Sequence, residues 1–119
     1  MYLLLFLIFI IVLYNTFSME GYTHKSLLSI EEAKDKIKDG EIDLIIDVRT
    51  KFEWNLGRHP KAIHIPFGSI QNYDFEEYKD KTVLLYCRTG TRAKMAMHEM
   101  EDKVKRVYYI DTTYDKLLD

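Results

Sequence analysis

Residues 82–92 read Thr-Val-Leu-Leu-Tyr-Cys-Arg-Thr-Gly-Thr-Arg, and this stretch predicts both the fold and the chemistry of the chain. An apolar run rich in β-forming residues leads to Cys87, the only cysteine in the sequence. A short loop with one glycine and two arginines follows, and a helical pattern then begins. When a parallel strand feeds a helix through such a loop, backbone amides and the helix N-terminus surround one point and favour anions there. Two guanidinium groups and the helix dipole favour the thiolate of Cys87, which is therefore predicted to be a nucleophile.

The residues after this loop form one apolar face of a helix. The apolar positions fall at i, i+3, i+4, i+7 and i+11, which is the spacing of a core-facing helix. These positions are Ala93, Ala96, Met97, Met100 and Val104. The methionines are therefore interpreted as core packing. Residues 106–110 predict a last strand, and residues 112–118 predict a short closing helix.

Two capping boxes mark helix starts before the loop. Ser29 followed by Glu32 begins a helix that Gly40 is well placed to end. Thr50 followed by Glu53 begins a second, shorter helix. Both helices are therefore predicted from residues three positions apart.

The remaining stretches complete an alternating pattern. Residues 43–48 form an apolar run with little alternation, which is typical of a parallel strand buried on both faces. Residues 62–67 predict a strand that Pro66 ends, and residues 74–79 predict a helical turn. Strands that alternate with helices predict an α/β fold, with a central, mostly parallel sheet covered by helices on both faces.

Residues 1–13 are almost entirely apolar, and the run fades over the next four residues. A membrane-spanning helix needs about 20 residues, with a lower limit near 17. Residues 1–17 are therefore predicted to be a hydrophobic transmembrane helix, acting as a membrane anchor or uncleaved signal in a membrane-associated protein. A cleaved signal peptide, which would leave an exported protein, and a buried core element are the alternatives. Residues 18–25 are interpreted as a linker, and residues 26–119 as the domain.

The composition fits one globular domain with a tail. The chain has 119 residues, of which 47% are hydrophobic and 30% are charged. The net charge of −2 gives no reason to expect nucleic acid as a partner. A single cysteine cannot form an internal disulfide. The four histidines show no metal-ligand spacing, so neither a metal nor a cofactor is predicted.

Three segments resemble the single-domain rhodanese (thiosulfate sulfurtransferase) family. Residues 87–92, Cys-Arg-Thr-Gly-Thr-Arg, resemble its active-site loop. Residues 47–49, Asp-Val-Arg, resemble its Asp-x-Arg at a strand end, and residues 57–66 resemble its Gly-His-Ile-x-Gly-Ala-x-x-x-Pro segment. The family's Gly-Gly-x-x-x-Trp near the C-terminus is missing, and residues 111–114 occupy its region. The resemblance covers about residues 26–111 and implies a rhodanese-like fold.

The resemblance also implies a sulfurtransferase. Cys87 would take sulfane sulfur from a donor such as thiosulfate, become a persulfide, and pass the sulfur to a thiophilic acceptor such as a thiol or cyanide. The loop amides would stabilise charge on the sulfur and on the departing anion. Asp47 and Arg49 would pair and support the loop. The predicted substrate-binding residues are those that follow the cysteine: Arg88, Thr89, Gly90, Thr91 and Arg92.

Two other functions stay open. One is a catalytically idle rhodanese-like module that recruits a partner to a membrane, although the intact Cys87 with both loop arginines weighs against it. The other is a phosphatase or arsenate reductase on the same fold. Four residues separate Cys87 from Arg92, whereas related phosphatases generally have five. Because a sulfur atom is smaller than a phosphoryl group, the shorter loop favours sulfur transfer.

Overall fold

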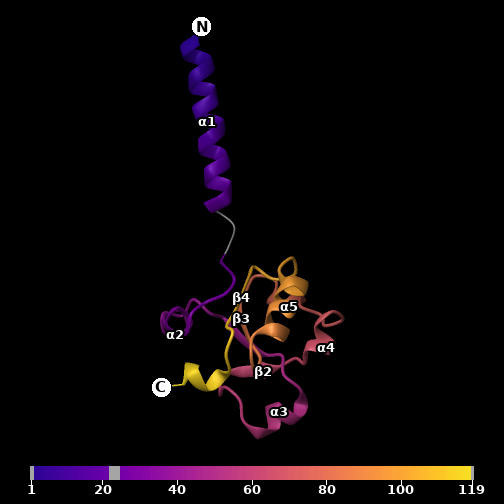
Figure 1. The fold of residues 1–119 in the computed structure, drawn as a ribbon. Helices are drawn as coiled ribbons and strands as arrows, with labels where there is room; N and C mark the ends of the chain where they lie inside the picture. Colours follow the sequence, from indigo (N-terminus) through magenta and orange to yellow (C-terminus); the bar gives the residue numbers. More distant parts are fainter. Residues whose placement is uncertain (1, 22–24, 119) are drawn as a thin grey trace.

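A parallel sheet of four strands forms the centre of the domain in the part of the chain that the structure describes (Figure 1). The computed structural model describes residues 2–21 and 25–118, and the side chains of residues 2–11 and 25–118. The sheet order is β2-β1-β3-β4, and each neighbouring pair is parallel, as predicted. The strands are β1 Leu44–Asp47, β2 Ala62–His64, β3 Thr82–Tyr86 and β4 Arg106–Tyr109.

Helices cover both faces of this sheet, which confirms the predicted layers. α5 and α4 pack on the face that carries Val83, Leu85 and Cys87. α2 and η2 pack on the opposite face, with Leu84 and Tyr86. Successive residues of β3 therefore serve two separate cores. The α-helices and 3-10 turns of the domain are α2 Ile30–Lys38, α3 Lys51–Leu56, α4 Phe67–Ile70, η1 Glu76–Tyr78, α5 Thr91–Met100 and η2 Tyr114–Leu117.

Both predicted capping boxes are present. Glu32 donates its backbone N–H to Ser29 Oγ at 3.1 Å, and its carboxylate accepts the Ser29 N–H at 3.0 Å. Thr50 and Glu53 repeat the arrangement at the start of α3. α2 ends just before Gly40, whose φ of +75° is the left-handed conformation that stops helices.

The core-facing positions predicted around α5 are all buried: Ala93, Ala96, Met97, Met100 and Val104. α5 ends at Met100, so Val104 reaches the core from the turn that follows the helix. The predicted helical turn at residues 74–79 contains η1, and the predicted closing helix at residues 112–118 contains η2.

The predicted strand over residues 62–67 is too long. β2 ends at His64, and the short helix α4, which was not predicted, begins at Phe67. Pro66 lies between the two elements. Because proline lacks an N–H group it cannot extend the strand ladder, and its fixed φ suits a helix start.

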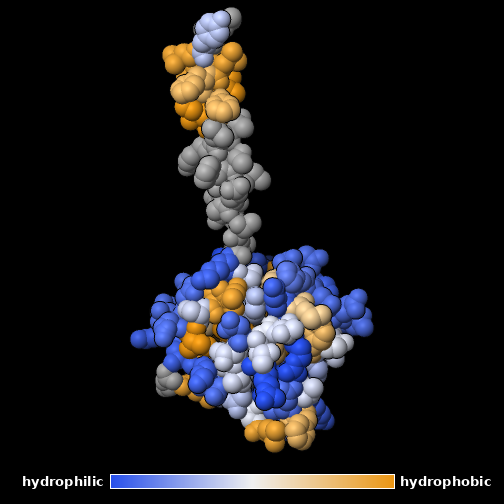
Figure 2. Space-filling view, in the orientation of Figure 1, coloured by the Kyte–Doolittle hydropathy of each residue, from blue (hydrophilic) through white to orange (hydrophobic). Residues whose placement is uncertain are grey.

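The N-terminal segment forms a helix, α1 (Tyr2–Gly21), which continues past the predicted boundary at residue 17 into the predicted linker. Residues 22–24 lie outside the described residues. The large apolar side chains of residues 2–11 are at least 44% exposed (Figure 2), so the alternative of a core element is wrong for them. Within the described residues, no helix is both long enough and apolar enough to cross a membrane. The predicted transmembrane helix is therefore not supported by the part of the chain that the structure describes.

Candidate active site

The predicted site residues gather at the carboxyl ends of β1 and β3, which are neighbours at the centre of the sheet. Asp47 ends β1, and Cys87 directly follows β3. The chain passes from β1 to β2 on one side and then to β3 on the other side, so the strand order reverses between β1 and β3. Open α/β sheets bind ligands at such a switch point.

Cys87 lies at the N-terminus of α5, and its sulfur caps that helix. Sγ accepts hydrogen bonds from the backbone N–H groups of Gly90, at 3.1 Å, and Ala93, at 3.4 Å. The N-cap residue is Gly90, which has no side chain, so Sγ replaces the usual capping oxygen. Two amides and the dipole of α5 therefore stabilise negative charge on the sulfur. Cys87 is fully buried in the core on this face, which fixes the position of the sulfur.

Gly90 allows the loop to close against the segment that follows β4. Its φ is +96°, in the left-handed region that residues with a Cβ rarely adopt. A Cβ at this position would lie only 2.6 Å from the Cα of Asp111. Because that neighbour is backbone and cannot rotate away, the close approach requires glycine. The active-site loop therefore packs directly against the backbone of the segment after β4.

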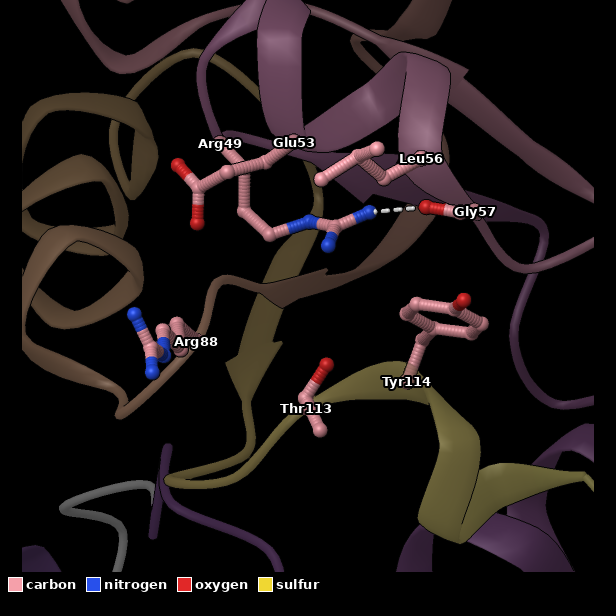
Figure 3. A pocket seen from close by; sticks show the side chains of 7 residues that line it. All are labelled: Arg49, Glu53, Leu56, Gly57, Arg88, Thr113 and Tyr114. Atoms are coloured by element: carbon pink, nitrogen blue, oxygen red, sulfur yellow. Dashed lines mark hydrogen bonds between the residues drawn. The ribbon is translucent and has the colours of Figure 1, made fainter.

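Asp47, Arg49 and Tyr86 form a buried hydrogen-bonded group beside the loop. Asp47 accepts the backbone N–H and the guanidinium of Arg49, each at 2.8 Å, and the hydroxyl of Tyr86 at 2.6 Å. Arg49 also donates to the carbonyl of Gly57 (Figure 3). Burial, together with the hydrogen bond to Asp47, raises the pKa of Tyr86, which therefore stays protonated as a donor. The predicted pairing of Asp47 with Arg49 is present, and it ties β1, β3 and the end of α3 together.

Arg92 is paired with Glu53 across the mouth of the loop. The two terminal guanidinium nitrogens of Arg92 donate to the two carboxylate oxygens of Glu53, at 2.7 and 3.1 Å. These bonds, with those from Thr50, lower the pKa of Glu53 to about 2, so the carboxylate is charged at neutral pH. The sequence assigned Arg92 to the substrate and Glu53 only to a helix start. In the structure, both terminal guanidinium nitrogens of Arg92 are hydrogen-bonded to Glu53.

A cavity of about 390 Å³ lies beside the loop (Figure 3). Among the predicted loop residues, Arg88 lines this cavity, whereas Thr89 and Thr91 are exposed outside it. Arg88 has no acidic partner among the residues that the structure describes. The cavity is lined by residues from four stretches of the chain: Arg49, Glu53, Leu56, Gly57, Arg88, Thr113 and Tyr114.

Several lining residues were not predicted from the sequence. Thr113 and Tyr114 occupy the region where the family motif is missing, so no pattern marked them. The guanidinium of Arg49 lies 5.0 Å from the centre of the Tyr114 ring, which makes this ring one wall of the cavity. Glu53 and Leu56 come from α3, which the sequence predicted only as a helix.

The histidines nearest to this region do not line the cavity. His59 is buried, its Nδ1 accepts the Lys61 N–H, and burial, followed by the charge of Lys61, lowers its pKa. His64 stacks on Trp54 with ring centres 4.8 Å apart. Over residues 2–21 and 25–118, no group of three or more histidine, cysteine or acidic side chains is arranged to hold a metal ion.

The sequence profile of the rhodanese-like domain family matches residues 29–118, which include every residue of the site just described. The chain belongs to this family. The match explains the loop, the Asp47–Arg49 pair and the parallel sheet as parts of one rhodanese-like domain.

Several proteins with sulfurtransferase names are similar to this rhodanese-like domain. It is 35% identical over 66 residues to a sulfurtransferase of Allochromatium vinosum, covering 56% of this chain and 62% of that protein. It is 32% identical over 78 residues to the thiosulfate sulfurtransferase GlpE of Coxiella burnetii, covering 65% and 72%. The human single-domain sulfurtransferase TSTD1 shares the fold, with a TM-score of 0.67 and 17% identity over 80% of this chain and 96% of that one. The chain thus spans less than two thirds of the Allochromatium protein.

Proposed function

We propose that this rhodanese-like protein is a sulfurtransferase that moves sulfane sulfur from a donor such as thiosulfate to a thiophilic acceptor. The observation that carries the proposal is the position of the Cys87 sulfur at the start of α5, where the amides of Gly90 and Ala93 point at it. These donors favour a thiolate and would equally favour the charged outer sulfur of a persulfide. The relatives with sulfurtransferase names support the same reaction.

The proposed reaction has two displacements. The Cys87 thiolate attacks the outer sulfur of thiosulfate, the S–S bond of the donor breaks, and sulfite leaves with the electron pair of that bond. Cys87 then carries one extra sulfur and one negative charge, as a persulfide. An acceptor such as cyanide attacks the outer persulfide sulfur, leaves as thiocyanate, and restores the thiolate. A covalent intermediate between two substrates implies ping-pong kinetics.

The test is incubation of the protein with thiosulfate and cyanide, measuring thiocyanate. We expect thiocyanate to form with parallel lines in a double-reciprocal plot at several cyanide concentrations. Para-nitrophenyl phosphate is the comparison substrate. Efficient hydrolysis of this ester without thiocyanate formation would favour the phosphatase alternative, and inactivity with both substrates would favour the idle module.

Replacing Arg92 is expected to lower thiosulfate use, and alanine is expected to do more harm than lysine. Alanine leaves the Glu53 carboxylate unpaired beside the site, whereas lysine retains one charge but loses the two-nitrogen fork. Repulsion of the thiosulfate dianion by that unpaired carboxylate is expected to lower kcat/KM by roughly tenfold. The matched control is Lys94→Ala, an exposed cation on the same helix. Equal activity of Arg92→Ala and the control would make Arg92 a surface charge only.

We also propose that residues 1–17 hold the protein at a membrane. The support is the set of apolar side chains of α1 that the structure leaves exposed. Each methylene group moved from water into lipid contributes about 0.8 kcal/mol, so ten such residues favour the bilayer strongly. We expect the full-length chain in the membrane fraction and a chain that begins at Gly21 in the soluble fraction. Full-length protein recovered in the soluble fraction would contradict this proposal, and a shortened soluble chain would show a cleaved signal.

A further inference from the structure

The cavity beside the loop carries less positive charge than the two loop arginines suggest. Arg49 is neutralised by Asp47, and Arg92 is neutralised by Glu53, in each case through at least two hydrogen bonds. Glu53 itself lines the cavity, and Arg88 is the lining cation without an acidic partner among the described residues. An incoming anion therefore meets one available positive charge, with a carboxylate close by.

The opposite end of the cavity offers apolar surface from Leu56 and the Tyr114 ring, on either side of the hydrogen-bonded Arg49–Gly57 pair. Figure 3 shows Glu53 and Arg88 at one end, and Leu56, Gly57 and Tyr114 at the other. Leu56 is 74% exposed, so its side chain is available to a ligand. The Tyr114 ring faces it across the cavity from the segment after β4.

The size of the cavity also exceeds the needs of a small inorganic ion. Cavities that hold organic ligands begin at about 300 Å³. A thiosulfate dianion would leave much of the apolar wall uncovered and would bring two charges to a cavity with one unpaired cation, Arg88.

We propose that the preferred sulfur donor of this protein is an organic sulfane-sulfur compound with at most one negative charge, such as an organic persulfide or thiosulfonate, because the Glu53–Arg92 pair leaves the cavity too little positive charge to favour a dianion. This inference rests on the proposed sulfurtransferase function. Arg88 holds the single charge, while Leu56 and Tyr114 contact the organic group. The Cys87 thiolate attacks the outer sulfur, the donor S–S bond breaks, and the organic thiolate or sulfinate leaves with the electron pair. Atoms and charge balance as they do for thiosulfate.

The test compares two donors that differ mainly in charge and in one organic group. Thiosulfate is a dianion, and benzenethiosulfonate is the related monoanion in which a phenyl ring replaces one charged oxygen. We expect wild-type kcat/KM to be at least about tenfold higher for benzenethiosulfonate. Glu53→Gln frees the charge of Arg92, and should raise kcat/KM for thiosulfate by roughly five- to tenfold and for benzenethiosulfonate by at most about two- to threefold, because a dianion is attracted twice as strongly.

The chain offers a matched control for this variant. Glu32 occupies the same capping-box position in α2, hydrogen-bonds Ser29 in the same way, and does not line the cavity. Glutamine suits this position in either box, so both helices should persist. Glu32→Gln is expected to leave the ratio of the two donors unchanged. A wild type that prefers thiosulfate would overturn the inference. So would a donor ratio of kcat/KM that changes equally in Glu53→Gln and Glu32→Gln, or that changes in neither variant.

A second pair of variants tests the apolar wall without touching the carboxylate. Leu56→Ala should lower the ratio of kcat/KM for benzenethiosulfonate to kcat/KM for thiosulfate by about fivefold, the effect of losing a few buried methylene contacts. Phe52→Ala is the control, because Phe52 is equally exposed at 74% on α3 but does not line the cavity. If both variants lose benzenethiosulfonate activity equally, Leu56 is not a donor contact.

Binding to the Cys87→Ser protein separates this inference from the proposed function. Calorimetric titration with each donor, with and without Glu53→Gln, reports selectivity without any sulfur transfer. We expect tighter binding of benzenethiosulfonate and a gain for thiosulfate when Glu53 is replaced. If neither donor transfers sulfur to the wild type, the proposed function is wrong. The ratio of the dissociation constants of the two donors for the Cys87→Ser protein then still tests whether the cavity prefers the monoanion. Active wild type with equal binding of both donors would overturn the selectivity alone.

Discussion

Replacing Cys87 with serine is expected to abolish persulfide formation and to leave the fold intact. The sulfur is the group that would be attacked and released in the proposed reaction, and the chain has no second cysteine to replace it. The fold should persist because the serine hydroxyl can accept the amides of Gly90 and Ala93 that the sulfur accepts now.

Intact-mass spectrometry after treatment with a sulfane-sulfur donor measures the effect. One added sulfur atom is expected on the wild type and none on Cys87→Ser. Cys87→Ala is the matched control, since it should also gain no sulfur but lose about 1 kcal/mol of stability through the missing cap. An equal mass gain on the serine variant would show that another group carries the sulfur.

Replacing Asp47 with alanine is expected to have the largest effect on stability. Asp47 is completely buried and Arg49 is 7% exposed, so the change leaves a guanidinium and the Tyr86 hydroxyl without their shared acceptor. Breaking a buried ion pair from one side costs about 3–5 kcal/mol. We expect the lower end, about 3 kcal/mol, because Arg49 borders the cavity and keeps its bond to Gly57.

Thermal or urea unfolding followed by circular dichroism measures this loss. For a domain of this size, about 3 kcal/mol corresponds to a fall of more than about 10 °C in Tm. Asp43→Ala is the control, because Asp43 also accepts a backbone N–H, from Thr82 at 2.9 Å, but at an exposed position. That change should cost about 1 kcal/mol. Similar losses in the two variants would mean that burial of the Asp47 group adds nothing to stability.

The features that the sequence predicted correctly depend on residues close together in the chain. The capping boxes follow from residues three positions apart, and the strand run, loop and helix around Cys87 form one continuous stretch. The mostly parallel sheet followed from the alternation of such local units. The error at residues 62–67 also comes from local reasoning. These residues are mostly apolar, and apolar character alone does not show that the strand ends at His64 and that a helix begins after Pro66.

The features that the sequence missed depend on pairs far apart in the chain. Glu53 and Arg92 are separated by 39 positions, and each already had a satisfactory local interpretation. Tyr86 looked like one more apolar strand residue, although its hydroxyl reaches Asp47, also 39 positions away. Thr113 and Tyr114 belong to no motif and enter the site only because β4 returns the chain to the same edge of the sheet.

The contact between Gly90 and Asp111 has a consequence for the order in which the protein is assembled. The loop that holds the nucleophile fits against backbone that is synthesised some twenty residues later, after β4. Sheets whose strands pair through long crossovers have high contact order and fold slowly. A nascent chain therefore cannot complete its reactive centre until nearly all of the domain has left the ribosome.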